Sequence, residues 1–258
     1  MGSSEVIRKI SSWRKIRNSI SNENDIGLVM TMGNLHAGHS SLLKRSVQEN
    51  DITVLTIFVN PAQFNDKNDL KNYPRTEDAD IALAKSVGVD FILLFNVDEL
   101  YPDNYMYKID VSSDISKIME GDRRPGHFNG MLTIVVKMHC LVLPDRSYFG
   151  EKDYQQYVLV RDALEAFLIQ TKVIPCEIVR SNTKLALSSR NNRLSEKGLA
   201  HADVFPKILA NANLSDKQAA EILEQKGFKV DYINSFDGRR FGAVFLENIR
   251  LIDNIKLK

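Results

Sequence analysis

The sequence predicts an α/β protein built on a doubly wound parallel sheet, followed by a smaller α+β part. Two observations carry this prediction. A strand-like segment at 26–31 precedes a helical stretch and then a nearly continuous apolar, β-branched run at 52–59, which together form a βαβ unit. A run without polar alternation is typical of a parallel strand that is covered on both faces. Strand-like and helical segments then alternate to about residue 180, as in a sheet with helices packed on both sides.

The first element expected is a helix capped by Ser4, because apolar residues from Ile7 to Ile20 recur at helical spacing. The segments expected after it are a strand at 26–31, a helix at 40–50, a strand at 52–59, a helix near 76–88, a strand at 89–95, an apolar helix around 130–143, a short strand at 146–150, a helix at 153–169 and a strand at 171–179. Open sheets of this kind bind ligands at the carboxyl ends of their strands, so polar clusters at strand ends are the candidates for a site.

The pattern changes near residue 184, and we place a domain boundary there, with residues 1–184 in the sheet domain and 185–258 in a C-terminal domain. The elements expected in the second part are a helix at 195–212, a helix at 215–226 opened by Ser215 and Asp216, and strand-like segments at 228–236 and 242–252. This part is small for an independent domain, so we expect it to fold over the first as a lid.

The composition is that of a globular protein, with 258 residues, 43% hydrophobic and 26% charged. Lys and Arg number 34 against 33 Asp and Glu, so no overall field favours nucleic acid or an anionic membrane. Cys140 and Cys176 have apolar neighbours and no CxxC spacing, which predicts reduced core residues rather than metal ligands or catalytic thiols. Since neither a signal-like N-terminus nor a run of about 18 apolar residues occurs, we expect a cytoplasmic protein.

The junction between the strand at 26–31 and its helix reads TMGNLHAGHS over residues 31–40. His36 and His39 stand three apart at a helix start, where free N–H groups and the helix dipole favour a bound anion, and the glycines let a phosphate approach the backbone. Metal ligation or two surface histidines are the alternatives, although no third His, Cys or carboxylate lies nearby to complete a zinc site. The Walker GK[ST] ending and the GxGxxG fingerprint are both absent, so this is not a standard P-loop or dinucleotide site.

Two further clusters follow predicted strands. The segment 58–64, FVNPAQF, offers Asn60 and Gln63 in apolar surroundings, which suits a small hydroxy acid held by hydrogen bonds, although an isolated loop of this kind would be unremarkable. The segment 149–156, FGEKDYQQ, places Lys152 at a strand end, where a lysine is a natural point charge for a triphosphate. Its neighbour Asp153 could instead serve only to cap the following helix.

Three other segments carry weaker indications. LSSRN at 187–191 offers two hydroxyls and a guanidinium suited to phosphate oxygens, or a helix-capping turn. EGDRRPGHF at 120–128 is not periodic and is interpreted as a mobile loop, either a gate with Arg124 or His127 facing an anion or a solvated connector. Asp80 is expected to complement a helix dipole, with magnesium binding as the weaker alternative.

The clusters TMGNLHAGH, IFVNPAQF, YPRT, EGDRRPGHF, FGEKDYQQ and LSSRN, taken together over about residues 26–195, resemble the pantothenate synthetase family in order and spacing. That family belongs to the HxGH group of Rossmann-like nucleotidyltransferases and synthetases. The resemblance implies a carbon–nitrogen ligase of coenzyme A biosynthesis that condenses pantoate with β-alanine through a pantoyl-adenylate. It further implies ATP as co-substrate with Mg²⁺, release of AMP and pyrophosphate, and a homodimer.

The resemblance also implies roles for individual residues. The ATP site would comprise Met32, Gly33, Asn34, Leu35, His36, Ala37, Gly38, His39, Gly150, Glu151, Lys152, Asp153, Val179, Leu187, Ser188, Ser189 and Arg190. The catalytic residues would be His36, His39, Lys152 and Arg190, with His39 at the family's general-acid position. Pantoate and β-alanine would be held by Gln63 and Gln156, with Asn60 supporting that pocket. The resemblance names no metal ligand in this chain.

The chain departs from the family pattern at several positions. Met30 stands where proline is common, which places a larger, more flexible side chain beside the acid pocket. The usual Asp-Gly before LSSR is replaced in the segment 182–184, Asn-Thr-Lys, which removes a residue free to take positive φ. The segment 175–177 is likewise altered to Pro-Cys-Glu.

Two other functions compete with the ligase. A nucleotidyltransferase of the same group would stop at transfer of AMP or CMP to a phosphate, but it would call for Arg or Lys where Gln63 and Gln156 stand. A non-catalytic ATP-binding sensor would bind ATP and exchange no pyrophosphate with pantoate present.

Overall fold

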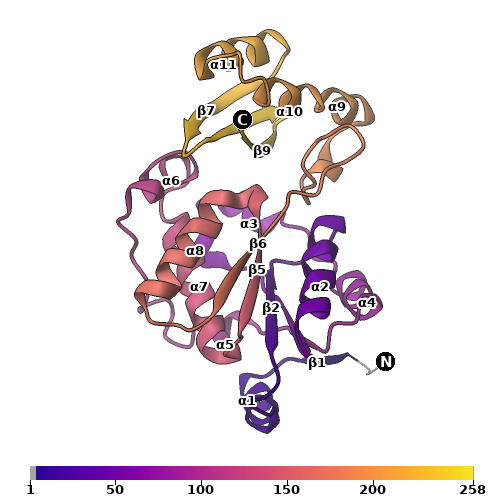
Figure 1. Ribbon diagram of the computed structural model, residues 1–258, viewed down its shortest axis with the longest axis vertical. Coiled ribbons are helices and arrows are strands. Elements are labelled where there is room, and N and C mark those ends of the chain that lie inside the picture. Colours follow the sequence, from indigo (N-terminus) through magenta and orange to yellow (C-terminus); the bar gives the residue numbers. More distant parts are fainter. Residues whose placement is uncertain (1–3, 258) are drawn as a thin grey trace. The chain divides into compact units, whose positions relative to one another are not determined.

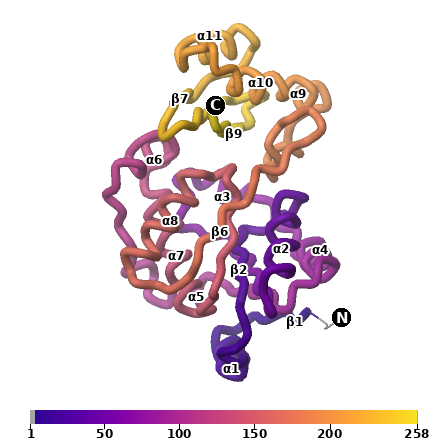
Figure 2. The backbone as a smooth tube through the Cα atoms, in the orientation of Figure 1, coloured from indigo at the N-terminus to yellow at the C-terminus, as the bar shows by residue number. Residues whose placement is uncertain are grey.

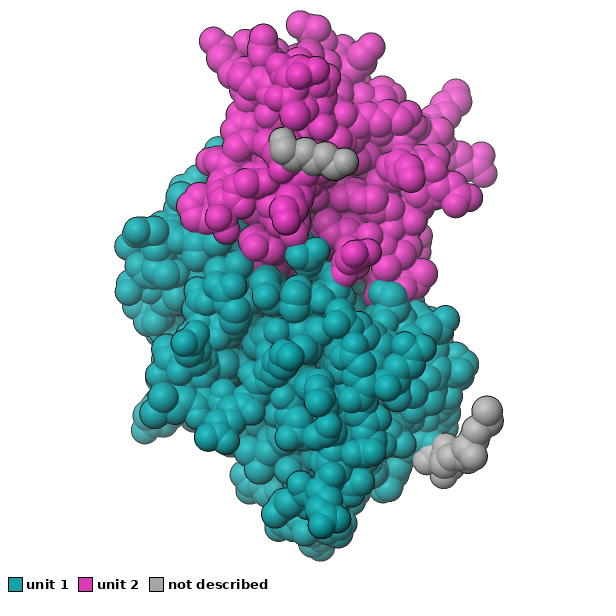
Figure 3. Space-filling view, in the orientation of Figure 1, with its two compact units in different colours: residues 1–35, 39–151, 155–176 teal, residues 36–38, 152–154, 177–258 magenta. Residues whose placement is uncertain are grey.

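The computed structural model describes residues 4–257, and the chain divides into two compact units (Figure 3). Among the described residues, the first unit comprises 4–35, 39–151 and 155–176, and the second comprises 36–38, 152–154 and 177–257. The main change of unit therefore falls at Glu177, upstream of the boundary predicted near 184. Two short motif segments of the N-terminal part group with the second unit.

The first unit is built on a six-stranded sheet in the order β1-β4-β3-β2-β5-β6, in which every strand pairs in parallel with its neighbours (Figure 1). Its strands are β1 (Glu5–Ile7), β2 (Ile26–Thr31), β3 (Ile52–Ile57), β4 (Phe91–Leu93), β5 (Arg146–Gly150) and β6 (Lys172–Cys176). The chain passes from β2 through β3 to β4 on one side and returns to β5 and β6 on the other. The order reverses between β2 and β5, so the predicted doubly wound sheet is confirmed.

Helices cover both faces of this sheet, with α2 and α4 on one side and α7 and α8 on the other (Figure 2). The longer helices are α1 (Ile10–Ser19), α2 (Ala37–Glu49), α4 (Glu77–Ser86), α7 (His127–Val142) and α8 (Tyr154–Ala166). The shorter ones are η1 (Pro61–Gln63), α3 (Lys67–Lys71), α5 (Val97–Leu100), η2 (Asp114–Lys117), α6 (Glu120–Arg123) and η3 (Glu151–Asp153).

Successive strand residues enter separate cores on the two faces of the sheet. Leu28 and Val54 pack with Trp13 of α1 in one core. Their chain neighbours Val29 and Leu55 pack in the other core, with residues of α2 and α4. Because the side chains of a strand alternate between faces, burial on both sides requires the unbroken apolar runs that the sequence shows.

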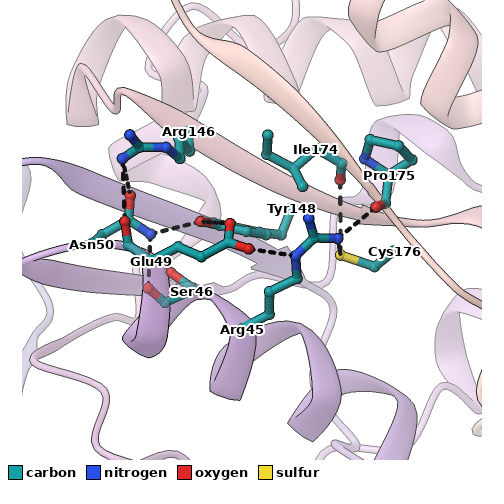
Figure 4. A network of polar contacts seen from close by, with 9 residues as sticks. All are labelled: Arg45, Ser46, Glu49, Asn50, Arg146, Tyr148, Ile174, Pro175 and Cys176. Carbon is teal, nitrogen blue, oxygen red and sulfur yellow. Dashed lines mark hydrogen bonds and ion pairs between the residues drawn. The ribbon is translucent and has the colours of Figure 1, made fainter.

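A polar network fastens α2 to the neighbouring strands β5 and β6 (Figure 4). Arg45 donates to Glu49 Oε1 and to the Pro175 carbonyl, both at 2.8 Å. The other oxygen of Glu49 accepts from the Tyr148 hydroxyl at 2.9 Å, and Asn50 donates to that hydroxyl at 2.7 Å. Apart from the Arg45–Glu49 pair within α2, these bonds join residues far apart in the sequence, and they hold the helix that carries His39 against the sheet.

The second unit contains a three-stranded antiparallel sheet in the order β7-β8-β9. Its elements are η4 (Asn191–Arg193), α9 (Glu196–His201), α10 (Val204–Leu209), α11 (Asp216–Gln225), β7 (Lys229–Phe236), β8 (Arg239–Leu246) and β9 (Ile249–Lys256). Ser215 caps α11 as predicted, and Gln218 completes a capping box. The second unit is therefore the small α+β structure that the sequence predicts.

The N-terminal prediction was wrong in part, because residues 5–7 form the edge strand β1 and the helix begins only at Ile10. The strand pairs in parallel with β4, and Val6 lies opposite Ile92. The first N–H of the helix, that of Ile10, is satisfied by Glu99 Oε2 at 2.8 Å rather than by Ser4. A tertiary partner has replaced the local cap.

Two predictions in the C-terminal part were also wrong. The helix expected at 195–212 is divided into α9 and α10, because Pro206 lies in the first turn of α10, where a helix needs no N–H donor. The segment 242–252 is two strands, not one. Glu247 and Asn248 take φ of 51° and 62°, the geometry of a type I′ hairpin turn.

Three other expectations need correction. The segment 120–128 is largely helical, since α6 fills its first half and α7 begins at His127. Cys140 is exposed on α7, whereas Cys176 is buried as predicted. No helix within residues 4–257 combines the length and apolar character needed to cross a membrane.

Candidate functional site

The loop that follows β2 is held by a buried carboxylate. Gly33 and Asn34 both take positive φ, 84° and 52°, which turns the chain sharply after the strand. Asp80 is 2% exposed, and it accepts from Asn34 N at 2.9 Å, from Leu35 N at 2.7 Å and from the Thr76 hydroxyl at 3.1 Å. The first turn of α4 thus holds the loop that leads to the two motif histidines.

This arrangement corrects the expectation for Asp80. Its two oxygens accept three hydrogen bonds from the protein, so it acts as the anchor of the loop and not merely as a partner of the helix dipole. A Cβ on Gly33 would stand 3.0 Å from Asp80 Oδ2 and 3.2 Å from Ile57, so the glycine is needed for space as well as for its φ.

The tautomer of the neutral His36 imidazole is set by the backbone of Gly38. Its Nδ1 accepts from the Gly38 N–H at 3.1 Å, so the ring proton is on Nε2. Burial lowers the pKa of His36, and the nearby Lys152 ammonium lowers it further, which favours the neutral ring at pH 7. A Cβ on Gly38 would lie 2.8 Å from the imidazole, so only glycine allows this bond. His36 therefore presents an N–H donor.

Lys152 lies in a polar setting within the second unit. Its ammonium is 3.7 Å from the Asp153 carboxylate, and its carbonyl accepts from Asn254 Nδ2 of β9 at 3.0 Å. Arg239 lies over the Tyr154 ring at 4.1 Å and donates to Asn254 Oδ1 at 2.6 Å. The motif segment 152–154 is thus bound to β8 and β9.

The segment 179–187 is a tight hairpin. Leu187 N donates to the Val179 carbonyl at 3.0 Å, and Ser181 N donates to the Leu185 carbonyl at 2.9 Å. Lys184 turns the chain with φ of 72°, so the positive φ remains although the residue is not glycine. The altered loop keeps its turn at the cost of backbone strain.

Arg180 anchors the base of this hairpin. Its guanidinium donates to both oxygens of the buried Asp253, at 2.6 and 2.9 Å, and also to the Lys184 carbonyl at 2.9 Å. A fork-shaped pair of this kind fixes orientation as well as position. Arg180 therefore ties the hairpin to β9.

The LSSRN segment continues directly from the hairpin. Arg190 N donates to Ser188 Oγ at 3.3 Å, and Asn191 N donates to the Ser188 carbonyl at 3.0 Å. Asn191 Nδ2 donates to the Ala186 carbonyl at 3.0 Å, while its Oδ1 is buried without a hydrogen-bond partner among residues 4–257. The shape of this turn is therefore set by bonds within the segment itself.

The second cluster predicted from the sequence forms a closed set of amide contacts in the first unit. Asn60 is 1% exposed and Gln63 is 8% exposed. Asn60 Nδ2 lies 3.0 Å from Gln63 Oε1 and 3.1 Å from the Gly130 carbonyl. Gln63 Nε2 lies 3.0 Å from Met32 Sδ, and the Tyr101 hydroxyl lies 2.9 Å from Asn60 Oδ1. The structure thus brings Met32, Asn60 and Gln63 together.

Helix α7 packs directly against this cluster. A Cβ on Gly130 would stand 2.1 Å from the Ala62 carbonyl oxygen, so the helix approaches η1 as closely as a glycine permits. His127 is buried, and its Nδ1 donates to the Gln63 carbonyl at 2.9 Å. Its Nε2 is 3.2 Å from Arg124 Nη1, and Arg124 pairs with Glu120 at 3.5 Å. His127 and Arg124 therefore support Gln63, and the segment is not a solvated connector.

The start of α8 holds a strained turn. Gln155 donates to the carbonyls of Ile115 and Ile118 at 2.9 and 3.0 Å and accepts from Glu120 N at 3.1 Å. Met119, which lies between Ile118 and Glu120, has backbone angles φ of 53° and ψ of −113°, a conformation that residues other than glycine rarely adopt. Its neighbour Gln156 is half-buried and makes no side-chain hydrogen bond to another residue of the described range. Gln155 is therefore structural, since its amide is fully used in holding this turn.

The site residues predicted from the sequence are divided between the two units. The first unit holds Met32, Gly33, Asn34, Leu35, His39, Asn60, Gln63, Gly150, Glu151 and Gln156. The second holds His36, Ala37, Gly38, Lys152, Asp153, Val179, Leu187, Ser188, Ser189 and Arg190. Sequence reasoning missed the supporting roles of Asp80, Tyr101 and Gln155, for which local pattern offers no signal.

The described residues contain no group of three or more His, Cys, Asp or Glu side chains that could hold a metal ion. Mg²⁺ commonly relies on substrate phosphates and one or two carboxylates rather than a protein cage.

Comparison with known proteins gives matches over nearly the whole chain. A family model described as pantoate-beta-alanine ligase matches residues 5–256. The pantothenate synthetase of Coxiella burnetii (strain RSA 493 / Nine Mile phase I) is 52% identical over 251 residues, which cover 97% of this chain and 96% of the relative. That of Legionella pneumophila (strain Lens) is 47% identical over 98% of this chain and all of the relative.

Solved structures agree with the sequence matches. A pantoate-beta-alanine ligase from Francisella tularensis, complexed with beta-gamma ATP and beta-alanine, is similar with a TM-score of 0.93 and 38% identity, covering 98% of both chains. The pantothenate synthetase of Thermus thermophilus is similar with a TM-score of 0.87 and 33% identity, covering 98% of this chain and 99% of that one.

Proposed function

Because the chain belongs to the pantoate-beta-alanine ligase family, we propose that it condenses pantoate with β-alanine in an ATP-dependent reaction that yields pantothenate, AMP and pyrophosphate. The observation that carries this proposal is the match in sequence and fold, over 98% of both chains, to a Francisella ligase complexed with beta-gamma ATP and beta-alanine. The neutral His36 and the amide pair Asn60–Gln63 support it, because the reaction needs phosphate donors and a pocket for a hydroxy acid.

The residues assigned to ATP are the motif residues that the sequence predicts. In the neutral ring that its lowered pKa favours, His36 offers Nε2–H as a donor, because Nδ1 accepts from the Gly38 N–H. Lys152 and Arg190 supply positive charge for the transferring phosphate. His39 is half-buried on α2 and would act as general acid toward the departing pyrophosphate.

The reaction has two displacements. In the first, a carboxylate oxygen of pantoate bonds to the α-phosphorus, the bond from that phosphorus to the bridging oxygen breaks, and pyrophosphate leaves. In the second, the amine of β-alanine bonds to the acyl carbon, the acyl–oxygen bond breaks, AMP leaves and the nitrogen loses a proton. Positioning and electrostatics dominate both steps.

Pantoate is held by Gln63 and Gln156, with Asn60 supporting the pocket. The half-buried Gln156 side chain makes no hydrogen bond to another described residue, so it is available to a ligand. Mg²⁺ binds as the counter-ion of the ATP phosphates. The C-terminal unit serves as a lid, and the protein acts in the cytoplasm as a homodimer.

The experiment that tests this function incubates the purified protein with ATP, Mg²⁺ and D-pantoate, with and without β-alanine, and follows AMP and amide product by mass spectrometry. Pantothenate and AMP that form together only when β-alanine is present are the expected result. AMP transfer to a phosphate acceptor without amide would favour the nucleotidyltransferase. ATP binding without any pantoate-dependent pyrophosphate exchange would favour the sensor.

A further inference from the structure

The side-chain amide of Asn60 has only one orientation that satisfies its surroundings. Its Oδ1 lies 3.3 Å from the Ala62 N–H, and a backbone N–H can only donate. Its Nδ2 lies 3.1 Å from the Gly130 carbonyl, and a carbonyl can only accept. Exchanging the two ends of the amide would set donor against donor and acceptor against acceptor. The two backbone groups therefore determine which end of the Asn60 amide is the oxygen and which is the nitrogen.

The orientation of Asn60 determines that of Gln63. The Asn60 amide donates to Gln63 Oε1 at 3.0 Å, so the oxygen of Gln63 is committed to Asn60 and its NH₂ group points the other way. That NH₂ lies 3.0 Å from Met32 Sδ, and a thioether is only a weak acceptor. A ligand oxygen would replace the sulfur with a stronger hydrogen bond.

Tyr101 completes the chain of donors. It is 3% exposed, and its hydroxyl donates to Asn60 Oδ1 at 2.9 Å. Lys137 lies over its ring at 4.2 Å and donates to the Leu100 carbonyl at 2.7 Å, which holds the ring in place. Burial and the adjacent Tyr105 raise the pKa of Tyr101, so its hydroxyl keeps its proton at neutral pH.

We propose that Tyr101 is a positioning residue which, through Asn60, fixes Gln63 as a hydrogen-bond donor toward the substrate. The group of the acid that meets Gln63 is then an acceptor oxygen, from its carboxylate or from a hydroxyl. This inference rests on the proposed function for the identity of the substrate. The polarity of the amide relay itself depends only on residues within the first unit.

The kinetic test begins with Gln63→Glu, which keeps the shape of the side chain and removes both N–H donors. We expect it to raise the KM for pantoate at least as much as Gln63→Ala does, by about 10- to 100-fold, because a lost hydrogen bond in a buried site has that magnitude. The ATP KM should change less than about threefold. A pantoate KM for Gln63→Glu within about twofold of wild type would overturn the proposal, because a carboxylate can only accept.

The relay is tested by Asn60→Asp and Tyr101→Phe. Asn60→Asp places an oxygen against Gln63 Oε1 and should turn the Gln63 amide around. In a double-mutant cycle, we expect Asn60→Asp to raise the pantoate KM by about tenfold or more in the Gln63 background and by less than about threefold in the Gln63→Ala background. Equal losses in both backgrounds would mean a merely structural role and would overturn the relay. Tyr101→Phe should raise the pantoate KM by about threefold to tenfold, with its melting temperature measured alongside.

A measurement without turnover separates this inference from the proposed function. In the ligand-free protein, the NH₂ protons of Asn60 should exchange slowly with solvent by nuclear magnetic resonance, and Tyr101→Phe should quicken this exchange. Fast exchange of the Asn60 NH₂ in the wild type would refute the relay. If the relay is present but the wild type does not use pantoate, the proposed function fails and the named substrate is withdrawn, while the polarity of Gln63 stands.

Discussion

The buried imidazole of His139 gives a quantitative prediction for the pH dependence of stability. His139 lies fully buried on α7, where Nδ1 donates to the Val135 carbonyl at 2.7 Å and Nε2 accepts from Ser147 Oγ at 3.0 Å. Burial lowers its pKa from 6.5 to about 4. Between pH 6.5 and 4 the unfolded chain therefore binds more protons at this histidine than the folded chain does. The free energy of unfolding keeps its full contribution from the buried neutral ring above pH 6.5, and it loses that contribution as the pH falls toward 4.

The magnitude follows from that gap in pKa. The free energy of unfolding should fall, relative to its value at pH 7, by about 1 kcal/mol at pH 6, about 2 kcal/mol at pH 5 and about 3 kcal/mol at pH 4 through this group alone. Carboxylates also titrate in this range, so the difference between two proteins is the quantity to measure. His139→Gln keeps a polar side chain at this position and does not titrate.

The assay is urea unfolding of the wild type and His139→Gln at pH 7, 6, 5 and 4.5. We expect the variant to be less stable at pH 7, because the shape of the side chain differs, and its deficit to shrink steadily as the pH falls. Ser147→Ala is the matched control, since it loses the hydrogen bond to Nε2 but keeps a buried ring that titrates, so its stability should still fall as the pH falls. A difference between wild type and His139→Gln that stays constant from pH 7 to 4.5 would refute the reasoning.

Four other predictions test the site and its supports. Gly130→Ala should lower the free energy of unfolding, measured with urea, by roughly 1–3 kcal/mol and raise the pantoate KM, because the added Cβ would force α7 away from η1. An unchanged free energy of unfolding and an unchanged KM would contradict the close approach of the helix. Lys184→Gly should raise the free energy of unfolding by up to about 1 kcal/mol, because φ of 72° suits glycine, whereas Lys184→Ala should not. Asp80→Asn should lower the free energy of unfolding by about 1–3 kcal/mol and weaken ATP binding measured by calorimetry, since one loop N–H loses its acceptor. A wild-type affinity for ATP in this variant would mean that the loop does not contribute to nucleotide binding. His39→Ala and Lys152→Ala should fold normally and lose adenylate formation by about 10²-fold or more in pyrophosphate exchange, and near-wild-type turnover in either would remove its assigned role.

The sequence by itself determined the architecture of both units. The parallel strands were recognisable because burial on both faces requires an unbroken apolar run, as in 52–57. The capping box at Ser215 was equally local, because its partners lie within one turn. The motif clusters identified the family, since six short segments in the right order rarely occur together. The assignment of individual site residues stays a prediction.

The tertiary structure decided whatever depends on partners distant in the sequence. Residues 5–7 became a strand only because β4 offered an unpaired edge, and Glu99 rather than Ser4 supplied the acceptor for the first N–H of α1. Asp80 was one carboxylate among several in a helix start until the fold brought it to the loop after β2. Tyr101 carried no signal at all.

The physical reason is the same in each case. Hydrophobic periodicity and capping are settled within a few residues, so the sequence displays them directly. A buried polar group must find its partner wherever the fold places one, and the free energy of that pairing depends on residues that no local pattern connects. The orientation of Gln63 is therefore decided by Asn60, Gly130 and Tyr101, which become neighbours only when the chain folds.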